Sequence, residues 1–128
     1  MLFRSSGIEA AAACEAAGVV LAVGHNRRFS AAAQALKSLW DEGAFGTVLH
    51  LEANFSAPGA LSYTPDKWRA NRIESPGGAL AGLGVHMIDL LCWLAGPVER
   101  IAAQAKRRAV PVEMEDTTSA IKIGRAHV

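Results

Sequence analysis

Cysteine is scarce in this chain of 128 residues, and so is any imbalance of charge. The two cysteines, Cys14 and Cys92, lie far apart in apolar stretches without CxxC spacing. This excludes a disulfide framework and a cysteine-based metal knuckle, and it suits a reducing cytoplasmic location. Thirteen lysines and arginines against twelve acidic residues give a net charge of +1, with both signs scattered along the chain. Since there is no basic stripe, we expect no nucleic-acid partner.

Long apolar runs are also missing, although 51% of the residues are apolar and 20% are charged, as in a soluble globular chain. The first residues lack the apolar run and small-residue cleavage site of a secretory leader. The longest apolar stretch, residues 79–96, carries His86 and Asp89 in its middle, and both would be costly in lipid. We therefore expect a buried helix there and no membrane partner.

The last six residues, Ile123 to Val128, resemble one reading frame of a widely used DNA sequencing adapter. We predict that residues 123–128 are non-native adapter read-through, and that the natural sequence is cut off at about Lys122. A genuine polar tail is the alternative. Removing Arg125 would bring the net charge to zero, so no argument from charge depends on this segment.

Hydrophobic periodicity predicts alternating helices and strands in the rest of the chain. The predicted helices are residues 6–17, 30–42 and 78–95. The predicted strands are residues 19–23, 48–55, 101–108 and 117–122. The first strand is continuously apolar, as in a parallel sheet covered on both faces, whereas the second alternates, as in an antiparallel or mixed sheet. This change of period between Gly24 and Gly46 marks a domain boundary. Residues 56–76 form a long loop of the kind that is usually functional.

The first candidate site is the segment GHNRRF, residues 24–29, which follows the expected strand 19–23. Ligands bind at the carboxyl ends of strands in open α/β sheets. Asn26 and the adjacent Arg27 and Arg28 can hold a phosphate or the polar edge of a cofactor. The alternative is a solvated turn whose arginines pair with surface acids, and the residue types alone favour it.

A second candidate is the pair Trp68 and Arg69 in the long loop. The indole offers a stacking face and the guanidinium a phosphate fork, a combination useful for binding a nucleotide. An equal alternative is a tryptophan that pins the loop to the core beside an exposed arginine.

The third candidate is the helix at residues 78–95, where Gly82, His86 and Asp89 have i, i+4 and i+7 spacing and so share one face. A histidine can relay a proton to or from a substrate hydroxyl at neutral pH. The more frequent case is a buried histidine bonded to a backbone carbonyl. No metal site is predicted, because His25 and His50 belong to unrelated elements.

The order of these segments carries more information than any one of them. The segment GHNRRF, then EGAFGTV at residues 42–48, then Trp68–Arg69, then GGALxxLGVHxID at residues 77–89 resembles the Gfo/Idh/MocA oxidoreductase family over residues 7–122. The resemblance implies an α/β fold. Residues 1–29 would be the C-terminal end of a Rossmann cofactor domain, and residues 30–122 a partial substrate domain with an open, mainly antiparallel or mixed sheet.

The resemblance also implies roles for individual residues. His86 matches the family's histidine at the substrate, which acts in proton transfer with a lysine that would fall before Met1. Asn26 and Arg27 match a segment close to the nicotinamide of NAD or NADP, and Trp68 and Arg69 match a pair that contacts the cofactor in some members. Asp89 matches a position that bonds a substrate hydroxyl or braces the helix. The implied partners are a small-molecule substrate, such as a sugar, inositol or related polyol or keto compound, and further copies of the parent protein, bound through the open sheet.

The sequence departs from the family pattern in two ways. No G-x-G-x-x-G phosphate turn is present, so this chain alone should neither bind a dinucleotide well nor catalyse. Gly82 stands where many members carry an aspartate, which would orient the imidazole of His86 and favour its protonated form. Two alternatives to a hydride-transferring oxidoreductase therefore stay open. One is a non-catalytic member that binds sugars or acts as a scaffold, and the other is an assembly fragment without independent function.

Overall fold

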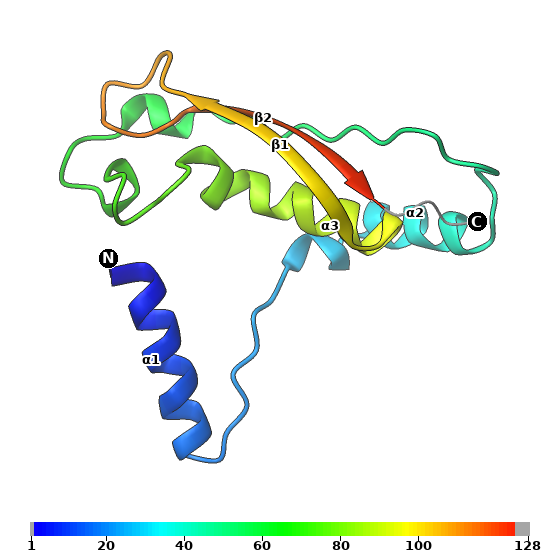
Figure 1. Cartoon of the computed structure of the whole chain (residues 1–128), viewed down its shortest axis with the longest axis horizontal. Helices are drawn as coiled ribbons and strands as arrows, with labels where there is room; N and C mark the ends of the chain where they lie inside the picture. Colours follow the sequence, from blue (N-terminus) through cyan, green and yellow to red (C-terminus); the bar gives the residue numbers. More distant parts are fainter. Residues whose placement is uncertain (1, 125–128) are drawn as a thin grey trace.

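The computed structural model describes residues 2–124, and the side chains of residues 6–124. In the described residues, two α-helices precede the long loop, and a third α-helix and two strands follow it; Figure 1 shows their arrangement. The elements in chain order are α1 (Leu2–Ala16), the 3-10 turn η1 (Asn26–Phe29), α2 (Ala31–Asp41), the 3-10 turns η2 (Pro58–Ser62) and η3 (Trp68–Ala70), the π-helical turn η4 (Leu80–Gly84), α3 (Val85–Ala95), β1 (Val98–Lys106) and β2 (Thr117–Gly124).

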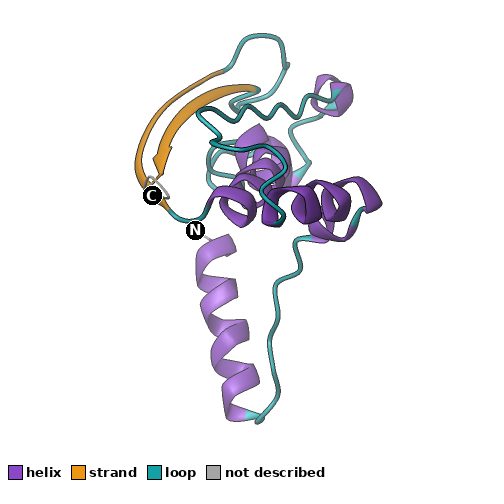
Figure 2. Ribbon diagram, turned by 90° about the vertical axis from the view of Figure 1, so that its right-hand side faces the viewer, coloured by secondary structure: helices purple, strands orange, loops and turns teal. Residues whose placement is uncertain are grey.

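Helix α1 projects away from the rest of the chain, to which a loop connects it (Figures 1 and 2). It begins at Leu2, before the predicted start at Ser6, because the first residues include good helix formers. It ends at Ala16, and Gly18 takes the left-handed conformation (φ +66°) that ends helices. Between Ser6 and Ala16 only Cys14 is even half-buried.

Two of the four predicted strands, at residues 19–23 and 48–55, are not strands in the structure. Both segments are irregular, and Val20 and Leu49 are 92% and 91% exposed. The apolar run and the alternation were correct patterns, but a strand also needs a neighbour for its N–H and C=O groups. Within residues 2–124, no strand pairs with either segment. The predicted long loop is confirmed, with η2 and η3 within it.

The other two predicted strands are confirmed and form an open antiparallel sheet. Strand β1 starts three residues earlier than predicted and β2 ends two residues later, and the register pairs Ile101 with Lys122 and Lys106 with Thr117. Ile123 and Gly124 of the suspected read-through segment pair with Arg100 and Val98. That pairing does not test their origin, and residues 125–128 lie outside the described residues.

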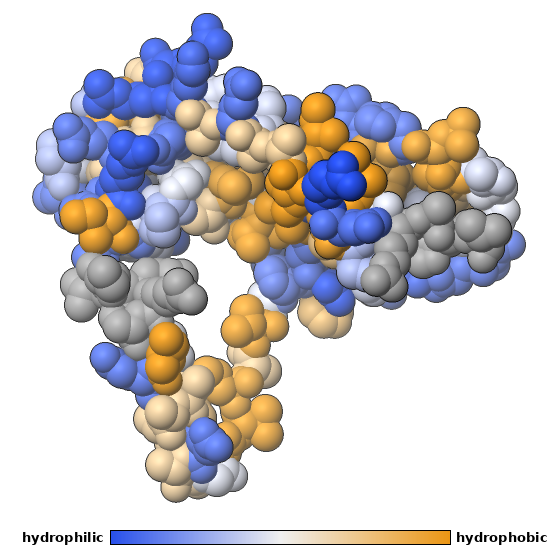
Figure 3. Space-filling model, in the orientation of Figure 1, coloured by the Kyte–Doolittle hydropathy of each residue, from blue (hydrophilic) through white to orange (hydrophobic). Residues whose placement is uncertain are grey.

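A small core lies beneath the loop that joins the two strands. Ala70, Val110, Val112 and Met114 are buried there, with Ala60 and Tyr63 packed against them. The carboxylate of Asp116 organises this loop by accepting backbone hydrogen bonds from three consecutive residues, Arg108 (2.9 Å), Ala109 (2.6 Å) and Val110 (2.8 Å). Many large apolar side chains stay exposed, visibly so along the loop after α1 (Figure 3).

The predicted helix at residues 78–95 is confirmed, but it opens with the π-turn η4 rather than with regular α-helix. The N–H of Val85 donates to the carbonyl of Leu80, five residues earlier. Gly84 permits this turn, because a Cβ there would lie 2.7 Å from Cδ1 of Leu80. Gly96, at φ +81°, ends the helix. Within the described part of the chain, no helix is long and apolar enough to cross a membrane.

Candidate active site

The 3-10 turn η1 and the residue that precedes it present the side chains of Arg28 and His25 to helix α3. In such a turn residues three apart lie on the same side, which aligns His25 with Arg28. The N–H of Arg28 donates to the carbonyl of His25 (3.2 Å), and Ser30 then caps α2 by accepting from the N–H of Ala33 (3.3 Å). The sequence GHNRRFS therefore forms a tight turn that leads into a capped helix, and both elements contact α3.

Arg28 and Asp89 join η1 to α3 through a two-pronged ion pair. The Nε and Nη2 atoms of Arg28 donate to the two carboxylate oxygens of Asp89 at 2.7 and 2.5 Å. The Asp89 side chain is only 8% exposed. The hydrogen bonds from Arg28 hold the pKa of Asp89 below its usual value, and the same bonds raise the pKa of Arg28.

His86 lies between two rings that come from distant parts of the sequence. Its ring centroid is 6.4 Å from that of His25, edge to face at 84°, and 6.4 Å from that of Phe55, tilted at 45°. Its Nδ1 atom is buried and has no hydrogen-bond partner among the described residues. The alternative considered from the sequence was a histidine that donates to a backbone carbonyl. The structure shows no such hydrogen bond at Nδ1. A buried polar atom without a partner is costly, and a ligand hydroxyl would relieve that cost.

Of the predicted cofactor residues, Asn26 and Arg27 lie at this site. Both belong to η1, and the guanidinium carbon of Arg27 is 5.1 Å from the centre of the Phe55 ring, whose other contact is His86. The predicted substrate residues His86 and Asp89 also lie there. Both oxygens of Asp89 are bound by Arg28, so in this structure Asp89 braces the helix.

The other predicted cofactor pair, Trp68 and Arg69, lies elsewhere. These residues form η3, near the N-terminal end of the helix that continues into α3, whereas η1 lies against α3 itself (Figure 1). The guanidinium of Arg69 stacks on the Trp68 ring at 4.2 Å. Trp68 is 48% exposed, and the pair borders a cavity of about 530 Å³ together with Tyr63. The structure does not bring Trp68 and Arg69 to His86.

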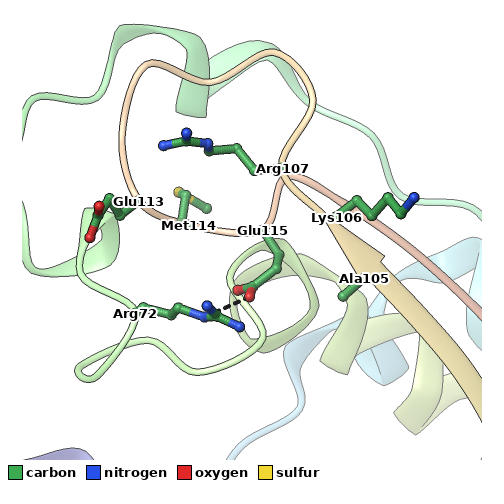
Figure 4. Close-up of a pocket in the computed structure, with 7 residues that line it drawn as sticks. All are labelled: Arg72, Ala105, Lys106, Arg107, Glu113, Met114 and Glu115. Carbon is green, nitrogen blue, oxygen red and sulfur yellow. Dashed lines mark ion pairs between the residues drawn. The ribbon is translucent and has the colours of Figure 1, made fainter.

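A second cavity, of about 410 Å³, lies beside the loop between β1 and β2. Figure 4 shows Arg72 pointing toward Glu115, and the Nε–Oε1 distance is 2.8 Å. The carbonyl of Glu115 also accepts from the N–H of Ala79 (2.9 Å). These contacts join the end of the long loop and the start of the helix that carries His86 to the loop that precedes β2. They support the candidate site but are not part of it.

Sequence reasoning missed two residues of the site. His25 was expected to lie in an element unrelated to His86, yet its Nε2 is 3.9 Å from Oδ1 of Asp89. Phe55 was expected to lie in the predicted strand at residues 48–55, and no sequence signal placed it beside His86. The adjacency of His25 to the candidate Asn26 and Arg27 was the available signal. Within residues 2–124, no group of three or more His, Cys, Asp or Glu residues is placed to hold a metal ion.

Comparison with known proteins agrees with this arrangement. Residues 33–122 match the family model of the GFO/IDH/MocA C-terminal domain. The chain belongs to the Gfo/Idh/MocA family. The predicted resemblance is confirmed, and so is the mixed fold with an open antiparallel sheet.

Two proteins with curated names resemble the chain over most of its length. It is 35% identical over 109 residues to the D-apiose dehydrogenase of Paraburkholderia graminis. It is 30% identical over 105 residues to an uncharacterized oxidoreductase of Schizosaccharomyces pombe. These alignments cover 84% and 80% of the chain but only 28% of each relative. The chain therefore spans less than a third of the length of these relatives.

Two solved structures share the fold. A protein of Desulfitobacterium hafniense assigned as an NADPH-dependent oxidoreductase is 33% identical with a TM-score of 0.77, and the match covers 85% of this chain and 32% of that one. An NAD binding oxidoreductase of Klebsiella pneumoniae is 25% identical with a TM-score of 0.72, over 89% and 33% of the two chains. The chain is thus similar to oxidoreductases that are named for NADPH or NAD.

Proposed function

We propose that this chain is part of an NAD(P)-dependent oxidoreductase that transfers a hydride to or from a sugar, an inositol or a related polyol or keto compound. The observation that carries the proposal is that Nδ1 of His86, beside η1, is buried and has no hydrogen-bond partner in the part of the chain that the structure describes. The family membership supports an oxidoreductase, and the name of the D-apiose dehydrogenase supports a sugar-like substrate.

His86 handles the proton of this reaction. When a substrate hydroxyl is oxidised, its carbon gives up a hydride and its oxygen gives up a proton. The neutral imidazole accepts that proton at Nδ1 and returns it in the reverse direction. Asp89 and Arg28 hold the helix that carries the imidazole.

The residues of this chain fit one end of a nicotinamide cofactor, which when bound supplies the hydride acceptor or donor. Asn26 and Arg27 would hold its polar edge, because they lie on η1 close to Phe55 and His86. The sequence holds no Gly-rich turn for the pyrophosphate. Trp68 and Arg69 lie apart from His86. The geometry of this site therefore gives no support to the contact with the cofactor that was predicted for them.

The parent protein is proposed to work as a cytoplasmic homo-oligomer that associates through the open sheet. Ile101 of β1 and Ile121 of β2 are 59% and 73% exposed, so the sheet carries exposed apolar side chains that a partner subunit would cover.

The test is an assay of the complete protein encoded by the reading frame that contains these residues. The purified protein is mixed with NAD or NADP and a panel of sugars, inositols and sugar acids that includes D-apiose, and reduced cofactor is followed by absorbance. Turnover of at least one compound supports the proposal. Cofactor binding without turnover of any compound would contradict it.

That contrary outcome would favour a non-catalytic role in sugar binding or as a scaffold. Gly82 is the observation behind this second candidate. No carboxylate stands near His86 at this position, and a Cβ there would meet nothing within 4 Å. Open space instead of a charged partner can admit a bulkier ligand without activating the histidine.

A further inference from the structure

The ion pair between Arg28 and Asp89 joins the two elements that form the candidate site. Arg28 lies on η1 with Asn26 and Arg27, and Asp89 lies on α3 one turn after His86. The pair spans 61 residues of sequence, and both prongs are short. The Arg28 guanidinium also lies 5.7 Å from the centre of the Trp93 ring, which fixes it from a second side.

The Asp89 carboxylate interacts electrostatically with both histidines of the site. His25 approaches it to 3.9 Å, and both His25 and His86 act on it electrostatically. As long as Arg28 binds both oxygens, the negative charge of Asp89 is largely neutralised. The other titratable or charged groups around this cluster are Arg27 across the Phe55 ring, Lys37 over the Trp93 ring, and Cys92 beside Arg28.

We propose that Arg28 is a positioning residue for the reaction proposed above, on which this inference rests. By binding both oxygens of Asp89 it fixes η1 against α3, so that His86 faces the segment Asn26–Arg27. It also screens His86 and His25 from the negative charge of the Asp89 carboxylate.

The planar fork of arginine suits this role better than a lysine. A guanidinium binds two carboxylate oxygens at once and stacks on an indole, whereas an ammonium acts as a point charge. Arg28→Lys keeps the charge but loses the second prong. Arg28→Gln leaves the carboxylate unpaired, and Asp89→Asn leaves the guanidinium unpaired, so the two substitutions shift the local charge in opposite directions.

The first experiment is an NMR titration of the histidine side chains in the complete protein. In Arg28→Gln the midpoint of the His86 titration moves to higher pH than in the wild type, because the unpaired carboxylate favours imidazolium. In Asp89→Asn it moves to lower pH, because an unpaired cation remains. Lys37→Gln is the matched control, since it removes a cation 5.8 Å from the same Trp93 ring without touching Asp89, and its midpoint stays in place. Midpoints that do not move, or that move together, overturn the proposal.

The second experiment measures turnover of the same variants. We expect kcat/KM to fall by about tenfold or more in Arg28→Gln, less in Arg28→Lys, and not in Lys37→Gln. The acid limb of the pH profile in Arg28→Gln moves with the His86 midpoint, which a loss of folding stability alone would not cause. Should Arg28→Gln fail to fold, Arg28→Lys and Asp89→Asn carry both measurements. No turnover by the wild-type protein overturns the proposed function. Wild-type turnover with an unaltered Arg28→Gln overturns the positioning role alone.

Discussion

The rings of His25 and His86 stand edge to face with their centroids 6.4 Å apart, although 60 residues separate them in the sequence. This contact exists because η1 docks on α3 through Arg28 and Asp89. The segment that the family resemblance assigns to the nicotinamide and the helix that carries the proposed proton acceptor therefore meet in one site. The predictions below follow from the packing and charge around that site.

The two glycines of the π-turn should respond differently to a methyl group. A Cβ at Gly84 would lie 2.7 Å from Cδ1 of Leu80, whereas one at Gly82 would meet nothing within 4 Å. We expect Gly84→Ala to be less favourable than Gly82→Ala by about 1 kcal/mol, because the Cδ1 methyl group of Leu80 must turn away. Gly82→Ala should be neutral or stabilising, since alanine is the better helix former. Urea denaturation compares the two, and equal effects would contradict the turn as described.

A carboxylate at position 82 should alter the acid limb of activity. The open space around Gly82 accommodates an aspartate four residues before His86. In Gly82→Asp the new charge favours imidazolium, so the acid limb of the kcat/KM profile moves to higher pH. Gly82→Asn controls for size without charge. Identical pH profiles for the three proteins would show that position 82 does not face the imidazole.

Asp116 should make stability depend on pH in the acid range. Hydrogen bonds from the backbone N–H groups of Ala109, Val110 and Arg108 lower the pKa of Asp116 from 3.8 to about 2. Because the folded value is depressed, the stabilisation is complete above pH 4 and is lost as the pH falls from about 4 to about 2. Asp116→Asn removes this component. In thermal melts of the complete protein, the difference in melting temperature between pH 7 and pH 3 should therefore be smaller for the variant than for the wild type. An equal difference would contradict this role.

Local signals predicted the helices well and the strands only in part. The cap of α2 at Ser30 and the left-handed conformation of Gly43 after it depend only on residues close by in the sequence. The apolar run at residues 19–23 is just as clear in the sequence, but whether it becomes a strand depends on a neighbour that the described residues do not supply. Pairing is not local, so the pattern alone could not decide it.

The candidate site could also be predicted only where local sequence signals define it. His86, Asp89, Asn26 and Arg27 could be named from the sequence because their motifs have a recognisable order. The sequence did not show that Arg28 occupies both oxygens of Asp89, nor that Phe55 and His25 flank His86. Those contacts depend on how η1 docks on α3. The π-turn that precedes His86 was likewise hidden, since its glycines are compatible with an ordinary helix.

The 128-residue chain by itself should not behave as a stable monomer. Its sheet has two strands, and residues buried among the described side chains are few and mostly small. A two-stranded sheet with open edges is at best marginally stable and tends to pair with other chains. We expect aggregation in size-exclusion chromatography and no cooperative thermal transition. A soluble monomer with a sharp melt would contradict this prediction and would favour an independent binding role.

The most direct test of the central claim is the steady-state kinetics of His86→Asn in the complete protein. The amide retains some polarity but cannot accept a proton from a substrate hydroxyl, so kcat/KM should fall at least tenfold while the protein stays folded. His50→Asn, at an exposed position outside the site, is the matched control and should turn over substrate like the wild type. A His86→Asn protein with wild-type kcat/KM would remove His86 from the mechanism and with it the function proposed for this site.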